Sequence, residues 1–118
     1  NMWIDTSARL PELGRHDPAR VRAFLTRYRS RIVFGTDLGI GAEGLMLGSS
    51  GRETPTMADV APFYRTHFRY FESTERDVPT PTPIQGDWSL DAIGLDESVL
   101  EDIYHRNAER LLGLRPSP

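Results

Sequence analysis

The chain has 118 residues, 38% of them hydrophobic and 26% charged, a composition typical of one globular domain. Its formal net charge of −3 provides no basic surface, so we expect neither nucleic acid nor a membrane as partner. All fourteen basic residues are arginine and cysteine is absent, which excludes Schiff-base, P-loop and metal-bridging lysines, disulfides and thiolate metal sites. The lack of cysteine suits a cytoplasmic protein.

Residues 1–37 predict a βαβ unit. Short apolar runs at 2–5 and 31–37 read as strands, and between them Asp17 and Pro18 are typical of a helix cap and first turn. Apolar residues then recur at helical spacing to residue 28, at Val21, Phe24, Leu25 and Tyr28. Strand, helix and strand in this order favour an α/β fold with two parallel strands. Because two such strands cover neither their faces nor their edges, we expect the chain to be part of something larger.

The remaining residues alternate between predicted loops and helices. Residues 38–58 contain five glycines without a sustained period and predict a long glycine-rich loop. Helical periodicity returns over 59–76, and the proline-rich stretch 77–94 predicts another loop. A closing helix is predicted over 95–113, with Asp96 as its cap and Gly113 at its end.

Asp37 is the main candidate for a catalytic or metal-binding residue. It follows an apolar strand directly, and the carboxyl ends of strands in parallel α/β folds are where active sites lie. The side chain is then a metal ligand or general base, although a turn or helix cap after a buried strand is the simpler alternative. Gly35 would let the backbone pass close to a ligand or a neighbouring strand. Asp5 holds the same position after the first strand, where Asp-Thr-Ser is also ordinary turn chemistry.

Other motifs carry weaker signals. His16, His67 and His105 have no metal-ligand spacing, so a structural or solvent-exposed role is favoured for each. Residues 39–44 match the letters GxGxxG after a strand, but the chain continues as a predicted loop rather than the helix that a dinucleotide site requires. We therefore do not expect nucleotide binding.

Four segments follow one another in this order: WIDTSA at 3–8, ELGR at 12–15, RIVFGTD at 31–37 and IYHRNAERLLG at 103–113. Together they resemble the C-terminal part of the amidohydrolase-related family, which comprises metal-dependent hydrolases and decarboxylases. The resemblance implies a partial (β/α)₈ barrel, comprising the last two parallel strands and their helices. It also implies that Asp37 binds a divalent metal, expected to be zinc, or takes a proton from the attacking water. Asn107 resembles part of a structural signature with no catalytic role.

The same resemblance implies that ligands are missing, because the family holds its metal mainly through histidines on strands that this sequence lacks. One carboxylate cannot build a site that needs three or more protein ligands. The isolated chain is therefore expected to bind no cofactor and to be inactive. A small-molecule substrate is expected only for the complete enzyme. Its expected partners are the missing barrel strands or a second copy. A decarboxylase and a non-catalytic structural or interaction module remain as alternatives.

Overall fold

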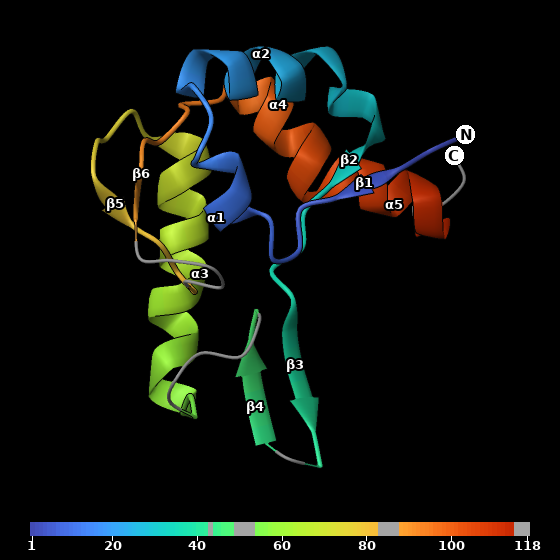
Figure 1. The fold of residues 1–118 in the computed structure, drawn as a ribbon. Helices are drawn as coiled ribbons and strands as arrows, with labels where there is room; N and C mark the ends of the chain where they lie inside the picture. The colour runs from blue at the N-terminus through green and yellow to red at the C-terminus, as the bar shows by residue number, and fades with distance from the viewer. Residues whose placement is uncertain (43, 49–53, 83–87, 115–118) are drawn as a thin grey trace.

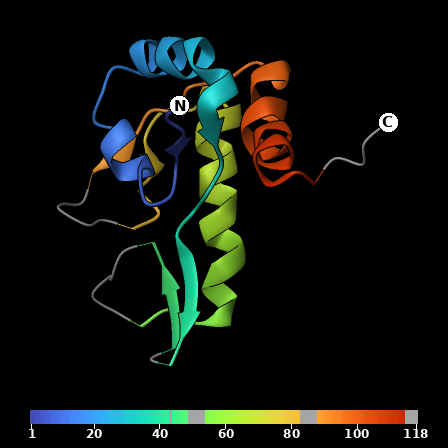
Figure 2. The same ribbon diagram turned by 90° about the vertical axis from the view of Figure 1, so that its right-hand side faces the viewer.

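The computed structural model describes residues 1–42, 44–48, 54–82 and 88–114. Among the described residues, helices and three small two-stranded sheets form a mixed α/β arrangement that contains no closed barrel (Figures 1 and 2). None of the helices in these ranges combines the length and apolarity that crossing a bilayer demands.

The predicted βαβ unit is present. Strands β1 (Ile4–Asp5) and β2 (Ile32–Val33) pair in parallel, with Ile4 opposite Ile32 and Asp5 opposite Val33. The short helix α1 (Leu10–Leu13), helix α2 (Pro18–Arg27) and the 3₁₀ turn η1 (Arg29–Arg31) connect them. The strands are shorter than the predicted runs at 2–5 and 31–37, because regular pairing covers only two residues on each side.

Helix α2 begins where the sequence predicts. The carboxylate of Asp17 caps it by accepting a 2.9 Å hydrogen bond from the amide of Arg20. Its apolar face is only partly covered, because Val21 and Leu25 are buried while Phe24 and Tyr28 remain 43% and 41% exposed. The helix therefore presents apolar surface that the described residues do not cover.

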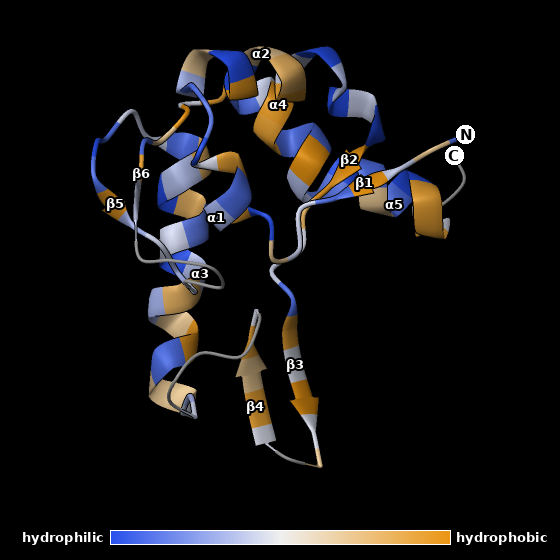
Figure 3. Cartoon of the chain, in the orientation of Figure 1, coloured by the Kyte–Doolittle hydropathy of each residue, from blue (hydrophilic) through white to orange (hydrophobic). Residues whose placement is uncertain are grey.

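The prediction of a loop over 38–58 is wrong for its first half. Strands β3 (Leu38–Gly41) and β4 (Gly44–Leu47) form an antiparallel hairpin, with Leu38 opposite Leu47. Apolar residues line both strands, and the hairpin lies beside the N-terminal half of α3 (Met57–Glu72) (Figures 1 and 3). Cross-strand pairing of these side chains outweighs the low strand propensity of the glycines. Residues 43 and 49–53 lie outside the described residues.

Helix α3 begins two residues before the predicted start at 59 and ends at 72 rather than 76. A capping box sets its start, since Thr56 and Asp59 satisfy each other's main-chain amides. Its inner face contributes Phe63, Tyr70 and Phe71 to the buried interior.

The predicted loop at 77–94 contains a short antiparallel pair, β5 (Val78–Pro79) with β6 (Ser89–Leu90). Residues 83–87 of that segment are outside the described ranges. The closing helix predicted over 95–113 is helical from Glu97 to Leu112, in three parts: α4 (Glu97–Glu101), the π-helical turn η2 (Asp102–Arg106) and α5 (Asn107–Leu112). Gly113 ends it in a left-handed conformation with φ 66°.

One core joins these elements. It packs α2 and the closing helices around β2, β5, β6 and the inner face of α3, through Leu10, Val21, Leu25, Ile32, Tyr70, Phe71, Val78, Leu90, Ala92, Ile93, Leu95, Val99 and Ile103. The carboxyl ends of β1 and β2 emerge from this core toward the hairpin (Figure 1). That rim is where the sequence places Asp5 and Asp37.

Candidate functional site

Thr6 joins the carboxyl ends of the two parallel strands. Its amide donates to the carbonyl of Val33 at 3.2 Å, which continues the β1–β2 ladder by one residue. Its hydroxyl then donates to the carbonyl of Gly35 and accepts from the amide of Gly35, both at 3.0 Å. A side-chain hydroxyl thus replaces the next main-chain partner, and the two strand ends lie side by side beyond the regular sheet.

Gly35 lies close to the segment that follows β1. A Cβ at this position would lie 2.2 Å from Oγ of Ser7 and 2.6 Å from Oδ1 of Asp5. The sequence-based interpretation of Gly35, a close approach to a neighbouring strand, agrees with this geometry. Sequence reasoning missed Thr6, for which the only signal is its position directly after a predicted strand.

Asp5 is exposed at this rim, but its carboxylate already has a local partner. Oδ1 accepts a 2.6 Å hydrogen bond from the amide of Ser7, two residues along the chain. Such a bond is the ordinary turn chemistry of aspartate after a strand. The structure therefore agrees with the simpler interpretation of Asp5.

Asp37 differs from Asp5 in its backbone and in its surroundings. It is exposed and adopts the left-handed conformation, with φ 63°, which residues other than glycine seldom adopt. Its carbonyl accepts a 3.0 Å hydrogen bond from Gly48, and this bond closes the base of the β3–β4 hairpin. Among the described residues, the carboxylate of Asp37 has no hydrogen bond or ion pair, so it is available to a ligand.

An aromatic cluster lies behind the rim. Phe34 stacks on Phe68 with ring centroids 5.6 Å apart and meets the edge of Tyr104 at 5.1 Å. The hydroxyl of Tyr104 donates to Oε1 of Glu72 at 3.0 Å. Burial, and then the nearby Glu72 carboxylate, raise the pKa of Tyr104. Tyr104 is thus a hydrogen-bond donor within the cluster rather than an acid that titrates at neutral pH.

The three histidines do not converge on a common site. His67 is buried against Phe63, and its Nδ1 lies 2.8 Å from the Phe63 carbonyl, to which it donates. Burial lowers the pKa of His67 and outweighs the opposing effect of that hydrogen bond, so the ring is neutral at pH 7. His16 is exposed on another face, and His105 contacts Glu109 at 3.0 Å.

The described residues therefore do not form a metal site by themselves. Within the described ranges, no three histidine or acidic side chains converge in a way that could hold one. Asp37 could supply a single ligand, fewer than the three or more that protein zinc sites use.

The GxGxxG match is also accounted for. Residues 39–41 belong to strand β3 and Gly44 begins strand β4, while residue 43 lies outside the described residues. The helix whose N-terminus would receive a pyrophosphate does not follow. The hairpin could have been recognised from the apolar residues on either side of the two-residue interval 42–43.

A family model described as amidohydrolase matches residues 1–114. The search of curated proteins and the search of solved structures returned no significant match.

Proposed function

The chain belongs to the amidohydrolase family, and we propose that it forms the C-terminal part of a metal-dependent hydrolase in which Asp37 takes part in the chemistry. Members of this family are generally metal-dependent and have a barrel fold. In this proposal β1 and β2 are the last two strands of a (β/α)₈ barrel, and α2 is the helix between them. Their parallel pairing across a helical crossover supports that assignment.

The observation that supports the proposal most directly is the exposure and position of the Asp37 carboxylate. An exposed carboxylate without a partner among the described residues lies four residues beyond the carboxyl end of the parallel strand β2, and barrel enzymes place their catalytic groups beyond these strand ends. Asp5, on the neighbouring strand, has a carboxylate engaged in a turn and serves as the internal comparison.

The role we assign to Asp37 is that of proton acceptor for the attacking water, or of metal ligand. A bound divalent metal, which we expect to be zinc, would supply Lewis acidity. Because Asp37 is only one ligand, the others would come from polypeptide outside this chain, and the 118 residues alone would be inactive. The alternative is decarboxylation of a substrate in the same site, which is the family's other reaction type.

The test requires an enzyme in which the remaining barrel strands are present. Asp37→Asn should lower kcat by at least about 10², because a general base contributes about 10²–10⁴ to the rate, while KM and the circular dichroism spectrum change little. The matched variant Asp5→Asn should lower kcat less. Measurements at saturating metal separate loss of the ion from loss of the base. An Asp37→Asn enzyme with nearly wild-type kcat would show that this carboxylate has a structural role and would overturn the proposal.

A further inference from the structure

The edge of β2 that faces away from β1 is covered by the closing helix. In the ladder with β1, the carbonyl of Val33 accepts from the amide of Thr6, so the main-chain groups of Ile32 and Phe34 point to the opposite side. The turn η2 and helix α5 lie along that side (Figure 1). The expectation from the sequence that neither edge of the sheet is covered is therefore wrong at β2.

Two hydrogen bonds join this edge to the closing helix. The amide of Phe34 donates to the carbonyl of Ile103 at 2.9 Å, and the side-chain amide of Asn107 donates to the carbonyl of Ile32 at 2.7 Å. In a parallel sheet, one residue of a neighbouring strand, opposite Val33, would bond to the same two groups through its own C=O and N–H. The closing helix therefore supplies what a strand would supply, and the two cannot occupy this position together.

The π-helical turn η2 explains how a helix can offer a carbonyl in this way. In an α-helix, the amide of Asn107 would donate to the carbonyl of Ile103, four residues earlier. In η2 it donates to the carbonyl of Asp102 instead, so the Ile103 carbonyl loses its α-helical donor and accepts from Phe34. Ile103 and Asn107 are both fully buried, so water does not compete for these bonds. Single π turns within α-helices are rare and often lie at functional sites.

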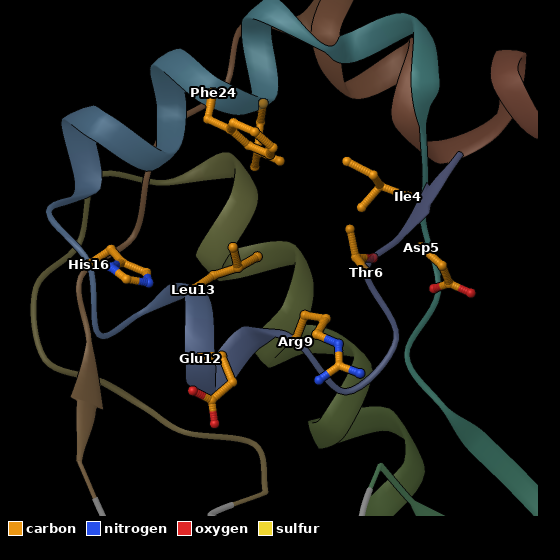
Figure 4. A pocket seen from close by; sticks show the side chains of 9 residues that line it. Ile4, Asp5, Thr6, Arg9, Glu12, Leu13, His16 and Phe24 are labelled. Carbon is orange, nitrogen blue, oxygen red and sulfur yellow. The ribbon is translucent and has the colours of Figure 1, made fainter. Parts of the chain in front are cut away.

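The β1 side of the sheet has no comparable cover. A pocket of about 230 Å³ lies there between β1, α1 and α2, with Ile4 and Leu13 turned toward the space (Figure 4). None of its lining residues belongs to β2 or to the closing helix. Among the described residues, no third strand pairs with either β1 or β2. The helical cover is thus specific to the strand that leads to Asp37.

The position of the Asp37 carboxylate depends on the backbone that precedes it. Among the described residues, the carboxylate makes no hydrogen bond or ion pair that would hold it directly. On one side of that backbone, Thr6 bonds to both main-chain groups of Gly35 at 3.0 Å. On the other side, the closing helix bonds to Ile32 and Phe34, and Phe34 lies three residues before Asp37. Loss of the helical cover would therefore release one side of the segment that carries Asp37.

We propose that the closing helix keeps this place in the complete enzyme, where it forms a seam between β2 and the first strand of the barrel. Asn107 is then a positioning residue for the reaction, because it acts through the backbone that leads to Asp37. The inference rests on the proposed function, since that function assigns β2 to the last strand of a barrel. The alternative is that the first strand displaces the closing helix and pairs with β2 directly.

Hydrogen exchange in the complete enzyme, with the wild-type sequence and with Asn107→Ala, tests the seam without requiring activity. In the seam, the Phe34 amide depends on the closing helix, so Asn107→Ala should lower its protection at least about tenfold more than that of Thr6, the effect of about one hydrogen bond. The Thr6 amide is the control because it bonds to Val33 on the other side of the strand. Equal changes at the two amides would show that a strand covers the edge and would overturn the proposal.

A measurement on the wild-type enzyme decides the question even when Asn107→Ala fails to fold. Nuclear Overhauser contacts from the amide proton of Phe34 should reach Ile103 and the side-chain amide of Asn107. Contacts to the main-chain protons of another strand in their place would mean that the closing helix is displaced, and the seam would not exist.

Kinetics of the complete enzyme test the positioning role. Asn107→Ala should lower kcat per folded molecule by about 10- to 100-fold with little change in KM, because a misplacement of about 1 Å can cost about 10² in rate. The matched control is Tyr104→Phe, which removes the 3.0 Å bond from the same closing helix to Glu72 of α3 and leaves the bonds to β2 intact. It should retain the wild-type kcat. Circular dichroism gives the folded fraction of each variant.

Equal kcat per folded molecule in Asn107→Ala and Tyr104→Phe would remove the positioning role, because a merely structural residue changes only the amount of folded enzyme. The proposed function fails separately, through an Asp37→Asn enzyme that retains its kcat. In that case the exchange and Overhauser measurements still decide whether the closing helix holds the edge of β2.

Discussion

The side-chain amide of Asn107 donates a 2.7 Å hydrogen bond to the carbonyl oxygen of Ile32, 75 residues earlier in the chain. The same nitrogen donates to the carbonyl of Arg29 at 2.6 Å, and the Oδ1 atom accepts from Arg110. Asn107 is fully buried. The Asn107 side chain therefore links the closing helix by hydrogen bonds to η1 and β2, the segments that precede Asp37.

Asn107→Ala should destabilise the chain substantially. It leaves the carbonyls of Arg29 and Ile32 without the partner they have now, and a buried unsatisfied group costs about 1–3 kcal/mol. We expect the free energy of unfolding in urea to fall by about 2–4 kcal/mol. Arg110→Ala, which removes an exposed side chain from the same network, should cost less than about 1 kcal/mol. Equal losses in the two variants would contradict the role assigned to the Asn107 amide.

Gly14→Ala tests packing without backbone strain. Gly14 has φ −68°, which any residue adopts, but a Cβ there would lie 2.3 Å from Cδ2 of the buried Leu90. Overpacking of this kind costs about 1–3 kcal/mol, to be measured by thermal or urea unfolding. A Cβ at Gly41 meets nothing within 4 Å, so Gly41→Ala should stay within about 0.5 kcal/mol of the wild type. Similar costs at the two glycines would show that the contact with Leu90 relaxes freely.

His67 should make stability depend on pH. Burial lowers its pKa in the folded state from the ordinary value of 6.5, so below that pH the unfolded chain binds more protons than the folded one. Stability is then highest above about pH 6.5 and falls as the pH drops toward the folded-state pKa, by at most about 1.4 kcal/mol per unit from this group. Urea unfolding at pH 7.5, 6.5 and 5.5 should show a smaller decline for His67→Gln. His16→Gln, at an exposed site, should retain the wild-type decline.

The elements that the sequence predicts correctly are those determined by residues within or next to the element itself. Asp17 and Pro18 lie next to the helix they start, and the apolar spacing through Val21 and Leu25 is set by that helix alone. Gly113 ends the closing helix for an equally local reason, its left-handed conformation. These signals gave the βαβ unit and the last helix.

The missed features depend on partners that are distant in sequence or on competing preferences. Nothing local marks Thr6 as the partner of Gly35, 29 residues away. The glycines of residues 38–58 predict a loop, whereas in the structure the apolar pairing of Leu38 with Leu47 forms the β3–β4 hairpin. At the candidate site, the predicted strand indicates where Asp37 lies. The left-handed backbone of Asp37 could not be predicted, because it depends on the hydrogen bond from Gly48 that closes the hairpin.

The backbone of Asp37 allows its structural and chemical roles to be separated. A left-handed conformation costs an ordinary residue about 1–2 kcal/mol, less for aspartate, and costs glycine nothing. Because the carboxylate has no partner among the described residues, Asp37→Gly should leave the free energy of unfolding unchanged or raise it by up to about 1 kcal/mol. Asp37→Val, with a branched Cβ, should lower it by more than about 1 kcal/mol.

Ala8 provides the calibration, since it has φ 53° and a side chain without chemistry. Ala8→Gly measures the backbone gain alone, and Asp37→Gly should match it to within about 0.5 kcal/mol in urea unfolding. In the complete enzyme, Asp37→Gly should also lose the kcat that Asp37→Asn loses, although its fold is no less stable. A clear loss of stability in Asp37→Gly relative to Ala8→Gly would mean that the carboxylate holds the rim together. In that case the chemistry of the site would have to be sought in another residue.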